Sequence, residues 1–181
     1  LIPPDLFQRV LLESTEMMVR NDGAATNQEV FMRSFLRGVG ISKDEIYPVF
    51  EEFYATEFPK LKEFTAPTAI SAQIIEAALA GGWQIILATN PLFPRQAIEE
   101  RMCWAGIHDY PWRHITSYET CHACKPNLLY YREIIENYGL DPGMSWMVGN
   151  DCQEDMVAKE LGFNTYLVKD YLIKKNDKYP V

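Results

Sequence analysis

Met147-Val148-Gly149-Asn150-Asp151-Cys152-Gln153-Glu154-Asp155-Met156 is the stretch that decides the fold. An apolar run leads into a glycine, and two carboxylates, Asp151 and Asp155, follow four residues apart. The pattern predicts a short buried strand, a turn at Gly149 and the start of a helix. Carboxylates at the end of a buried strand are costly to desolvate unless a cation lies between them, and Mg2+ is the usual cation for such oxygen ligands. The stretch therefore predicts a metal site; the alternative is that both aspartates only cap the next helix.

The residues around this stretch alternate between helical and strand patterns from about residue 66 onward. Four short runs of apolar or β-branched residues are predicted as strands, and apolar residues at helical spacing fill the segments between them. The predicted strands are residues 84–88, 114–117, 145–148 and 165–168, and the predicted helices begin near residues 70, 94, 126 and 156. Strands that alternate with helices over short links indicate an α/β fold, a Rossmann-like parallel sheet with helices on both faces.

Residues 1–65 have helical patterns only. A first helix is expected after Pro3-Pro4-Asp5, and capping-box pairs, Thr26 with Glu29 and Ser42 with Glu45, predict the starts of two more. The third helix is expected to continue to Phe58. The change of pattern near residue 65 predicts two domains, a small helical one over residues 1–65 and the α/β one over residues 66–181.

Composition limits the possible functions. The 181 residues carry a net charge of −8, which argues against a nucleic-acid binder because such proteins show a basic surface. No apolar run approaches a membrane span, and the N-terminus has no signal-like pattern, so we expect no membrane partner. The four cysteines lack the spacing of a disulfide framework, so we expect them to be reduced and the protein to be cytoplasmic. Cys121-His122-Ala123-Cys124 suggests zinc, but no second Cys/His pair follows at a suitable spacing.

Polar residues follow three of the predicted strands in turn. Thr89-Asn90 follows the first, Lys125 follows the second, and Asp151 with Asp155 follows the third. Ligands of open parallel sheets collect beyond the carboxyl ends of the strands. Each cluster has an ordinary alternative, a turn, a solvated lysine and a helix cap respectively, but their ordered arrival at successive strand ends predicts a phosphate-binding site.

These residues, in this order, resemble the haloacid dehalogenase (HAD) superfamily of phosphatases and related hydrolases. Residues 85–90, an apolar strand that ends in Thr89 and Asn90, are similar to its second motif. Lys125-Pro126 is similar to its third motif, and Gly149 to Asp155 is similar to its fourth, acidic motif. The resemblance extends over residues 66–170, and residues 1–65 occupy the place of the family's helical cap.

The family's first motif, a strand that ends in Asp-x-Asp and supplies the nucleophile, has no counterpart in the sequence. Asp22 follows no predicted strand and is no substitute. In this fold the absent strand would lie between the strands that end at Ala88 and Val148, and without it both would have an open apolar edge. We expect an N-terminal segment of about one strand and one helix outside these 181 residues.

The resemblance implies a magnesium-dependent phosphatase-type hydrolase that acts on a small phosphorylated metabolite through an aspartyl-phosphate. It assigns catalytic roles to Thr89, Lys125 and Asp155 and the metal to Asp151, or to Asn150 if the acidic pair is spaced one residue further apart. Candidate substrate contacts are Asn90, Arg20 and Asn21. The expected partner is the small substrate alone, with the protein a monomer or a homodimer.

Two further interpretations stay open at the level of sequence. Without a nucleophile, the chain would be a non-catalytic binding or regulatory pseudoenzyme of the same fold. The cysteine pair around His122 would instead indicate a metal or redox protein.

Overall fold

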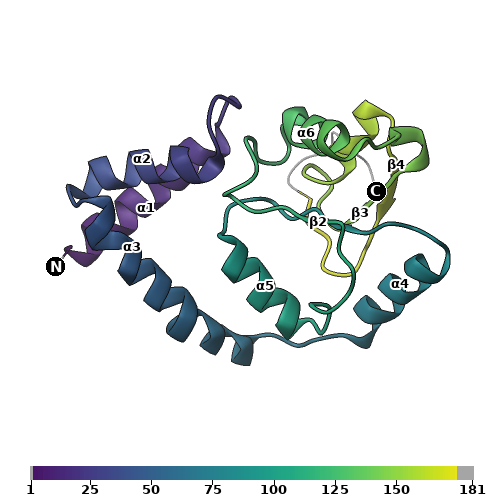
Figure 1. The fold of residues 1–181 in the computed structure, drawn as a ribbon, viewed down its shortest axis with the longest axis horizontal. Coiled ribbons are helices and arrows are strands. Elements are labelled where there is room, and N and C mark those ends of the chain that lie inside the picture. The colour runs from purple at the N-terminus through teal and green to yellow at the C-terminus, as the bar shows by residue number, and fades with distance from the viewer. Residues whose placement is uncertain (1, 175–181) are drawn as a thin grey trace.

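The computed structural model describes residues 2–174, and its N-terminal part is built from helices (Figure 1). The three predicted helices are present: α1 Pro4–Val19, α2 Asn27–Val39 and α3 Lys43–Glu52. Both predicted capping boxes are formed, at Thr26 and at Ser42. The expected continuation of α3 as an α-helix to Phe58 is wrong, because a π-helical turn, η1 Phe53–Glu57, and a 3-10 segment, η2 Phe58–Phe64, follow it instead.

Helices and short strands alternate in the rest of the described chain. They are α4 Ala69–Ala80, β1 Ile86–Leu87, α5 Arg95–Trp104, β2 His114–Ile115, α6 Leu128–Tyr138, the 3-10 turn η3 Pro142–Met144, β3 Trp146–Gly149, the 3-10 segment η4 Met156–Leu161 and β4 Asn164–Leu167. The α/β class with a small helical part is therefore confirmed. The division into two domains at residue 65 stays a prediction.

The strands form two separate pairs. β1 pairs with β2 and β3 pairs with β4, both in parallel, and β1 and β3 share no hydrogen-bonded ladder. The expectation that the four strands are parallel, and that those ending near Ala88 and Val148 are not directly paired, is confirmed for the described residues.

Side chains of β1 alternate between two helical layers. Leu87 and Ile115 pack against Ile98 and Met102 of α5, whereas Ile86 and Ala88 pack into the apolar cluster around α6. Figure 1 shows α6 on one side of the strands and α5 on the other. The β1–β2 pair is thus sandwiched by helices.

The β3–β4 pair is covered on one face only. Met147 is buried in the cluster around α6, but Trp146 and Val148 on the other face are 54% and 49% exposed. Val148 lies opposite Tyr166 of β4, which is also exposed. The sequence-based prediction of strands covered on both faces is therefore wrong for this pair, and an apolar strand face lies open to solvent.

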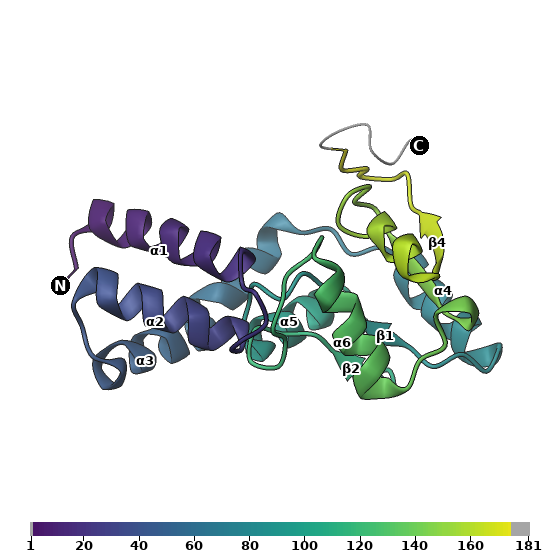
Figure 2. The same ribbon diagram turned by 90° about the horizontal axis from the view of Figure 1, so that it is seen from above.

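A groove of about 980 Å³ separates the two strand pairs. We call it the interstrand groove. Its walls are β1 and β3, and Ile74, Ile75, Tyr131, Ile134 and Phe163 contribute to its lining. α4, which lies at the opposite end of the view from α1, α2 and α3 in Figure 2, has Ile75 as its only buried residue, while Ile70 and Ile74 are more than half exposed. Such a concentration of exposed apolar side chains usually marks an interaction surface.

The helical N-terminal part shares its apolar packing with the α/β part. Cys124 belongs to the buried cluster formed by α1 and α2, and Leu92 and Tyr118 pack against that cluster. At the other end Phe58 stacks on Trp104 of α5, with ring centroids 5.3 Å apart. The helical part is therefore held to the α/β part at two places, near the start of α2 and at η2.

Close packing of α1 on α2 depends on Gly38. A Cβ built on Gly38 lies 2.5 Å from Cγ1 of Val10, a β-branched side chain that is 3% exposed. We predict that Gly38→Ala lowers the free energy of unfolding by about 1–3 kcal/mol through overpacking, which exceeds the gain of about 1 kcal/mol in helix propensity. Chemical denaturation measures the change.

In a Val10→Ala background the same substitution is expected to stabilise, because the clash is gone and only the propensity gain remains. A destabilisation of equal size in both backgrounds would contradict this account.

Candidate functional site

Lys125 and Asp155 form a buried ion pair beyond the ends of the strands. The Lys125 ammonium donates to Asp155 Oδ1 at 2.7 Å, and the two side chains are 5% and 9% exposed. The ammonium also lies 5.6 Å from the centroid of the Tyr130 ring. The predicted proximity of Lys125 to the acidic pair is confirmed, and the alternative of a solvated surface lysine is wrong.

Gly149 allows Asp155 to approach the end of β3. A Cβ on Gly149 would lie 2.0 Å from Asp155 Oδ2 and 2.4 Å from its Cγ, which no side chain could tolerate. With glycine in place, Asp155 Oδ2 accepts the Asp151 N–H at 3.0 Å. Residue 149 must therefore be glycine, because the Asp155 carboxylate, which pairs with Lys125, occupies the space that any side chain would need.

Asp151 is buried and organises the turn after β3. Its Oδ1 accepts the N–H groups of Gln153 and Glu154, both at 2.8 Å, and its backbone carbonyl accepts the Asp155 N–H at 3.0 Å. This oxygen thus holds the turn that precedes η4, whereas Asp155, the N-cap of η4, makes no side-chain cap hydrogen bond, so the capping of the next helix is not confirmed for either aspartate. An asparagine side chain retains the same acceptor, so a capping role alone does not require the charge at this position.

Asn90 connects three parts of the site. Its Oδ1 accepts the Lys125 N–H at 3.1 Å, and its Nδ2 donates to Glu154 Oε2 at 3.0 Å. Tyr131 donates its hydroxyl hydrogen to the Glu154 carbonyl at 2.7 Å. The Glu154 carboxylate was missed by the sequence analysis, although it lies between the two aspartates of the acidic stretch.

Thr89 lies in the same cluster through a hydroxyl network. Its Oγ1 lies 3.4 Å from both the carbonyl oxygen and Oγ1 of Thr116, which are long contacts. Thr116 Oγ1 donates to the Thr89 carbonyl at 2.9 Å, and the buried Tyr130 hydroxyl donates to the same carbonyl at 2.9 Å. Burial raises the pKa of Tyr130 well above its ordinary value, so this hydroxyl stays protonated as a donor. Thr116 was not identified from sequence, because nothing in its strand distinguishes it from a core threonine.

Three of the predicted site residues are engaged elsewhere. Arg20 is exposed and pairs with Glu16 one helical turn away. Asn21 is 5% exposed, and its side chain bonds to Gly23 and Ala25 in its own loop and to Asn27 at the start of α2. Asn150 donates its side-chain amide to the Tyr171 carbonyl at 2.7 Å. Their predicted roles in binding substrate or metal stay predictions that these contacts do not favour.

The cysteine pair shows no metal geometry. Cys121 and Cys124 are both buried, and burial raises the pKa of Cys121 to about 11 and that of Cys124 to about 12. His122 bonds through Nδ1 to Glu133 at 2.6 Å. Within residues 2–174 no group of three or more His, Cys, Asp or Glu side chains is arranged to hold a metal ion. Thiols held in the protonated form are poor metal ligands and poor nucleophiles.

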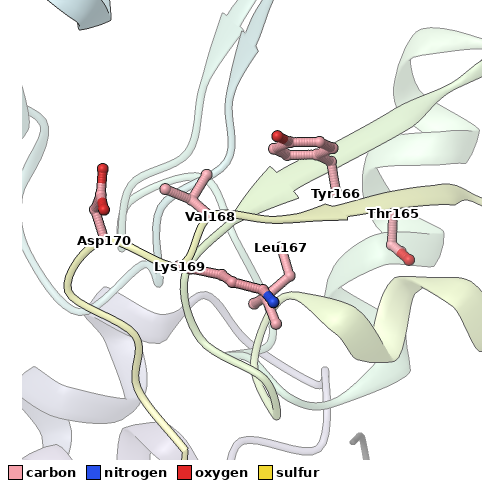
Figure 3. Close-up of a pocket in the computed structure, with 6 residues that line it drawn as sticks. All are labelled: Thr165, Tyr166, Leu167, Val168, Lys169 and Asp170. Atoms are coloured by element: carbon pink, nitrogen blue, oxygen red, sulfur yellow. The ribbon is translucent and has the colours of Figure 1, made fainter. Parts of the chain in front are cut away.

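A second hollow follows β4 (Figure 3). It is lined by Thr165, Tyr166, Leu167, Val168, Lys169 and Asp170. Tyr166 and Val168 point to one side of the strand and Leu167 and Lys169 to the other. Because the lining comes from a single extended segment, no groups from different elements converge there, and we assign it no ligand.

The chemistry of the strand-end cluster suits a phosphate ester with a divalent cation. The cluster contains one ammonium, of Lys125, which pairs with Asp155, and the further carboxylates of Asp151 and Glu154, so its formal charge with all four groups ionised is −2. Carboxylate oxygens are the ligands that Mg2+ prefers, and one or two of them with substrate phosphate suffice for it. The donor set thus fits part of a magnesium site, in which the resemblance gives Asp151 the metal.

Part of the sequence matches a known family model, and the fold is similar to that of solved structures. Residues 122–176, which include Lys125 and the acidic turn, match the HAD-hydrolase-like family model. No curated protein matches the sequence. Among solved structures, a HAD phosphatase from Thermococcus onnurineus is similar at a TM-score of 0.57 and 16% identity, over 97% of this chain and 83% of that one.

Two other solved structures are similar at a TM-score of 0.53 and 15% identity. A HAD family enzyme from Bacteroides thetaiotaomicron is matched over 96% of this chain and 80% of its own. The L-2-haloacid dehalogenase from Xanthobacter autotrophicus, with chloropropionic acid covalently bound, is matched over 90% of this chain but only 63% of its own length. No helix among residues 2–174 is both long and apolar enough to cross a membrane.

Substitutions at the ion pair test its energetic importance. We predict that Asp155→Asn lowers the free energy of unfolding by about 3–5 kcal/mol, because it leaves the buried Lys125 ammonium without a counter-charge. Lys125→Met in the same chain should recover most of this loss, since the ammonium that lost its counter-charge is then also removed. Denaturation of the two single variants and the double variant measures the coupling. Strictly additive changes would show that the pair is not energetically coupled.

Proposed function

The fold is that of the HAD superfamily, as the sequence resemblance indicated, and we propose that the protein is a magnesium-dependent phosphatase-type hydrolase that acts on a small phosphorylated metabolite. The observation that carries the proposal is the buried Lys125–Asp155 pair, held beside Asp151 and Asn90 where β1 and β3 end. A desolvated ammonium at strand ends is suited to the negative oxygens of a transferring phosphoryl group. Desolvation increases its electrostatic attraction for them.

In this proposal each residue of the cluster has a task. Lys125 binds a phosphoryl oxygen while Asp155 holds its ammonium in place. The Thr89 hydroxyl, which makes only long contacts in the structure, turns to donate to a second phosphoryl oxygen. Asn90 fixes the backbone of Lys125 and the carboxylate of Glu154. Asp151, with Asn150 as the alternative ligand, holds Mg2+, which neutralises phosphate charge when bound.

The nucleophile is proposed to arrive on a strand that fills the interstrand groove. The groove lies between β1 and β3, whose facing edges are unpaired in the described residues, and its lining is largely apolar. A parallel strand in the groove would form backbone hydrogen bonds with β1 on one side and with β3 on the other. Its carboxyl end would then lie beside Thr89 and the end of β3. An aspartate at that end would attack phosphorus and form the aspartyl-phosphate while the P–O ester bond breaks and the alcohol leaves with a proton from water. A second water would then hydrolyse the aspartyl-phosphate to inorganic phosphate and restore the aspartate. We propose that this strand belongs to an N-terminal segment outside these 181 residues.

Activity of the full-length protein tests the proposed chemistry. We expect it to release phosphate from members of a panel of small phosphorylated metabolites only when Mg2+ is present. Asp151→Asn should abolish turnover while leaving the fold intact, because asparagine still accepts the Gln153 and Glu154 N–H groups. Millimolar Mg2+ should raise the melting temperature of the parent protein but not that of the variant.

Asp141→Asn is the matched control, since Asp141 Oδ1 accepts the Gly143 N–H in a similar local turn. This variant should keep both activity and the magnesium response. A parent protein whose melting temperature and phosphate release are both indifferent to Mg2+ would rule out the magnesium-dependent phosphatase. An inactive full-length protein that still binds phosphorylated ligands would favour the pseudoenzyme instead.

Occupation of the groove is tested by hydrogen exchange. We expect the intact mass of the natural protein to exceed 20.9 kDa, and the amides at the facing edges of β1 and β3 to exchange more slowly in it than in the 181-residue chain. The reason is that a strand in the groove would bond to those edges. The paired amides of the β3–β4 ladder serve as the internal reference. Equal exchange in both proteins would mean that no strand occupies the groove.

A further inference from the structure

Asn27, the first residue of α2, is fully buried, and the proposed chemistry does not use it. Its Nδ2 donates towards the Pro91 carbonyl at 3.3 Å, the Ala123 carbonyl at 3.2 Å and Cys124 Sγ at 3.3 Å. Its Oδ1 accepts from Asn21 Nδ2 at 2.9 Å. One side chain of the helical part thus bonds two loops that lie 64 and 96 residues further along the chain.

Backbone groups of the same helical turn reinforce these contacts. The Asn27 N–H donates to the Cys121 carbonyl and the Gln28 N–H to the Tyr118 carbonyl, both at 2.8 Å. The capping box at Thr26 fixes the direction of these N–H groups. The free donors at the start of α2 are therefore satisfied by the loop that leads to Lys125.

Both loops bonded by Asn27 end at the site. Pro91 directly follows Asn90, and Ala123 and Cys124 directly precede Lys125. Asn90 and Lys125 are themselves bonded, through Asn90 Oδ1 and the Lys125 N–H. Asn27 and Asn90 therefore hold the same two loops together at neighbouring points, one from the helical part and one from within the α/β part.

We propose that Asn27 is a positioning residue that sets the placement of Lys125 against Asp155. The importance of this positioning for catalysis rests on the proposed function. The placement of the Lys125 side chain by Asn27 is a property of the fold and does not depend on it. The position needs a short side chain with two donor hydrogens and one acceptor oxygen. Aspartate lacks the donors, and leucine would leave the Pro91 and Ala123 carbonyls buried without this partner.

The NMR signal of the Lys125 ammonium in the full-length protein tests the proposal. Lysine labelled with 15N and 13C gives a signal for a buried, hydrogen-bonded ammonium, which is assigned by its loss in Lys125→Met. In Asn27→Ser, which shortens the side chain, we expect this signal to shift and to broaden as the ammonium exchanges faster with water. Asn27→Asp, which keeps the shape and loses the donors, should have the same effect.

Ser14→Ala is the matched control. Ser14 is also fully buried and bonds across the helical part to Ser34 at 3.1 Å, and this bond joins α1 to α2 rather than to either loop. This variant should lose stability while its Lys125 signal stays unchanged. An unchanged Lys125 signal in folded Asn27→Ser, or an equal change in Ser14→Ala, would overturn the proposal.

If neither Asn27 variant folds, hydrogen exchange in the parent protein decides the question. The Lys125 N–H should then open together with the amides of Asn27 and Gln28, and independent opening would overturn the proposal.

Turnover separates this proposal from the proposed function. With an active substrate, Asn27→Ser should lower kcat by about 10- to 100-fold, because small misplacements of a catalytic group have effects of this size. The KM should change much less, since Asn27 does not contact the substrate. A Lys125 signal that responds to Asn27 in a protein without phosphatase activity would support the positioning role and refute the phosphatase. A large loss of kcat with an unchanged Lys125 signal would support the phosphatase and refute the positioning role of Asn27.

Discussion

The buried ion pair between Lys125 and Asp155 is the interaction on which the site depends. Two charges that are almost fully removed from water are stable only as a pair with good geometry and further hydrogen bonds. Asp155 also accepts the Asp151 N–H, and Lys125 is fixed at its backbone by Asn90. Gly149 is obligatory beside them because any side chain there would occupy the space of the Asp155 carboxylate. The loops that follow β1, β2 and β3 are in this way held together around the Lys125–Asp155 ion pair.

The interstrand groove imposes the second constraint. Strands with open edges and an exposed apolar face are a liability for a protein in water. Here β1 and β3 face the same groove, and the exposed side chains Trp146 and Val148 lie on the open face of β3. The polar cluster lies at the carboxyl ends of both strands. The chemistry of the site and the packing of the sheet therefore depend on the same occupant of the groove.

Local sequence predicted most of the helices and the order of the strands, because caps, glycines and apolar spacing are local signals. The proximity of Lys125 to the acidic pair was predicted from the geometry of parallel sheets. The exposure of one face of the β3–β4 pair was not predicted, since the sequence of an apolar strand is the same whether or not a neighbouring element covers it. Asn27 could not have been identified either, because its partners lie far away in sequence and an asparagine after a capping box has no distinctive pattern.

The attachment of the helical part at two places has a consequence for access to the site. One attachment is the hydrogen-bonded start of α2 on the loops before Lys125 and after Asn90, and the other is the stacking of Phe58 on Trp104. A swing about one linker would require one attachment to break, with exposure of buried polar groups or of a stacked aromatic pair. The helical part is therefore better described as a fixed wall of the site than as a lid.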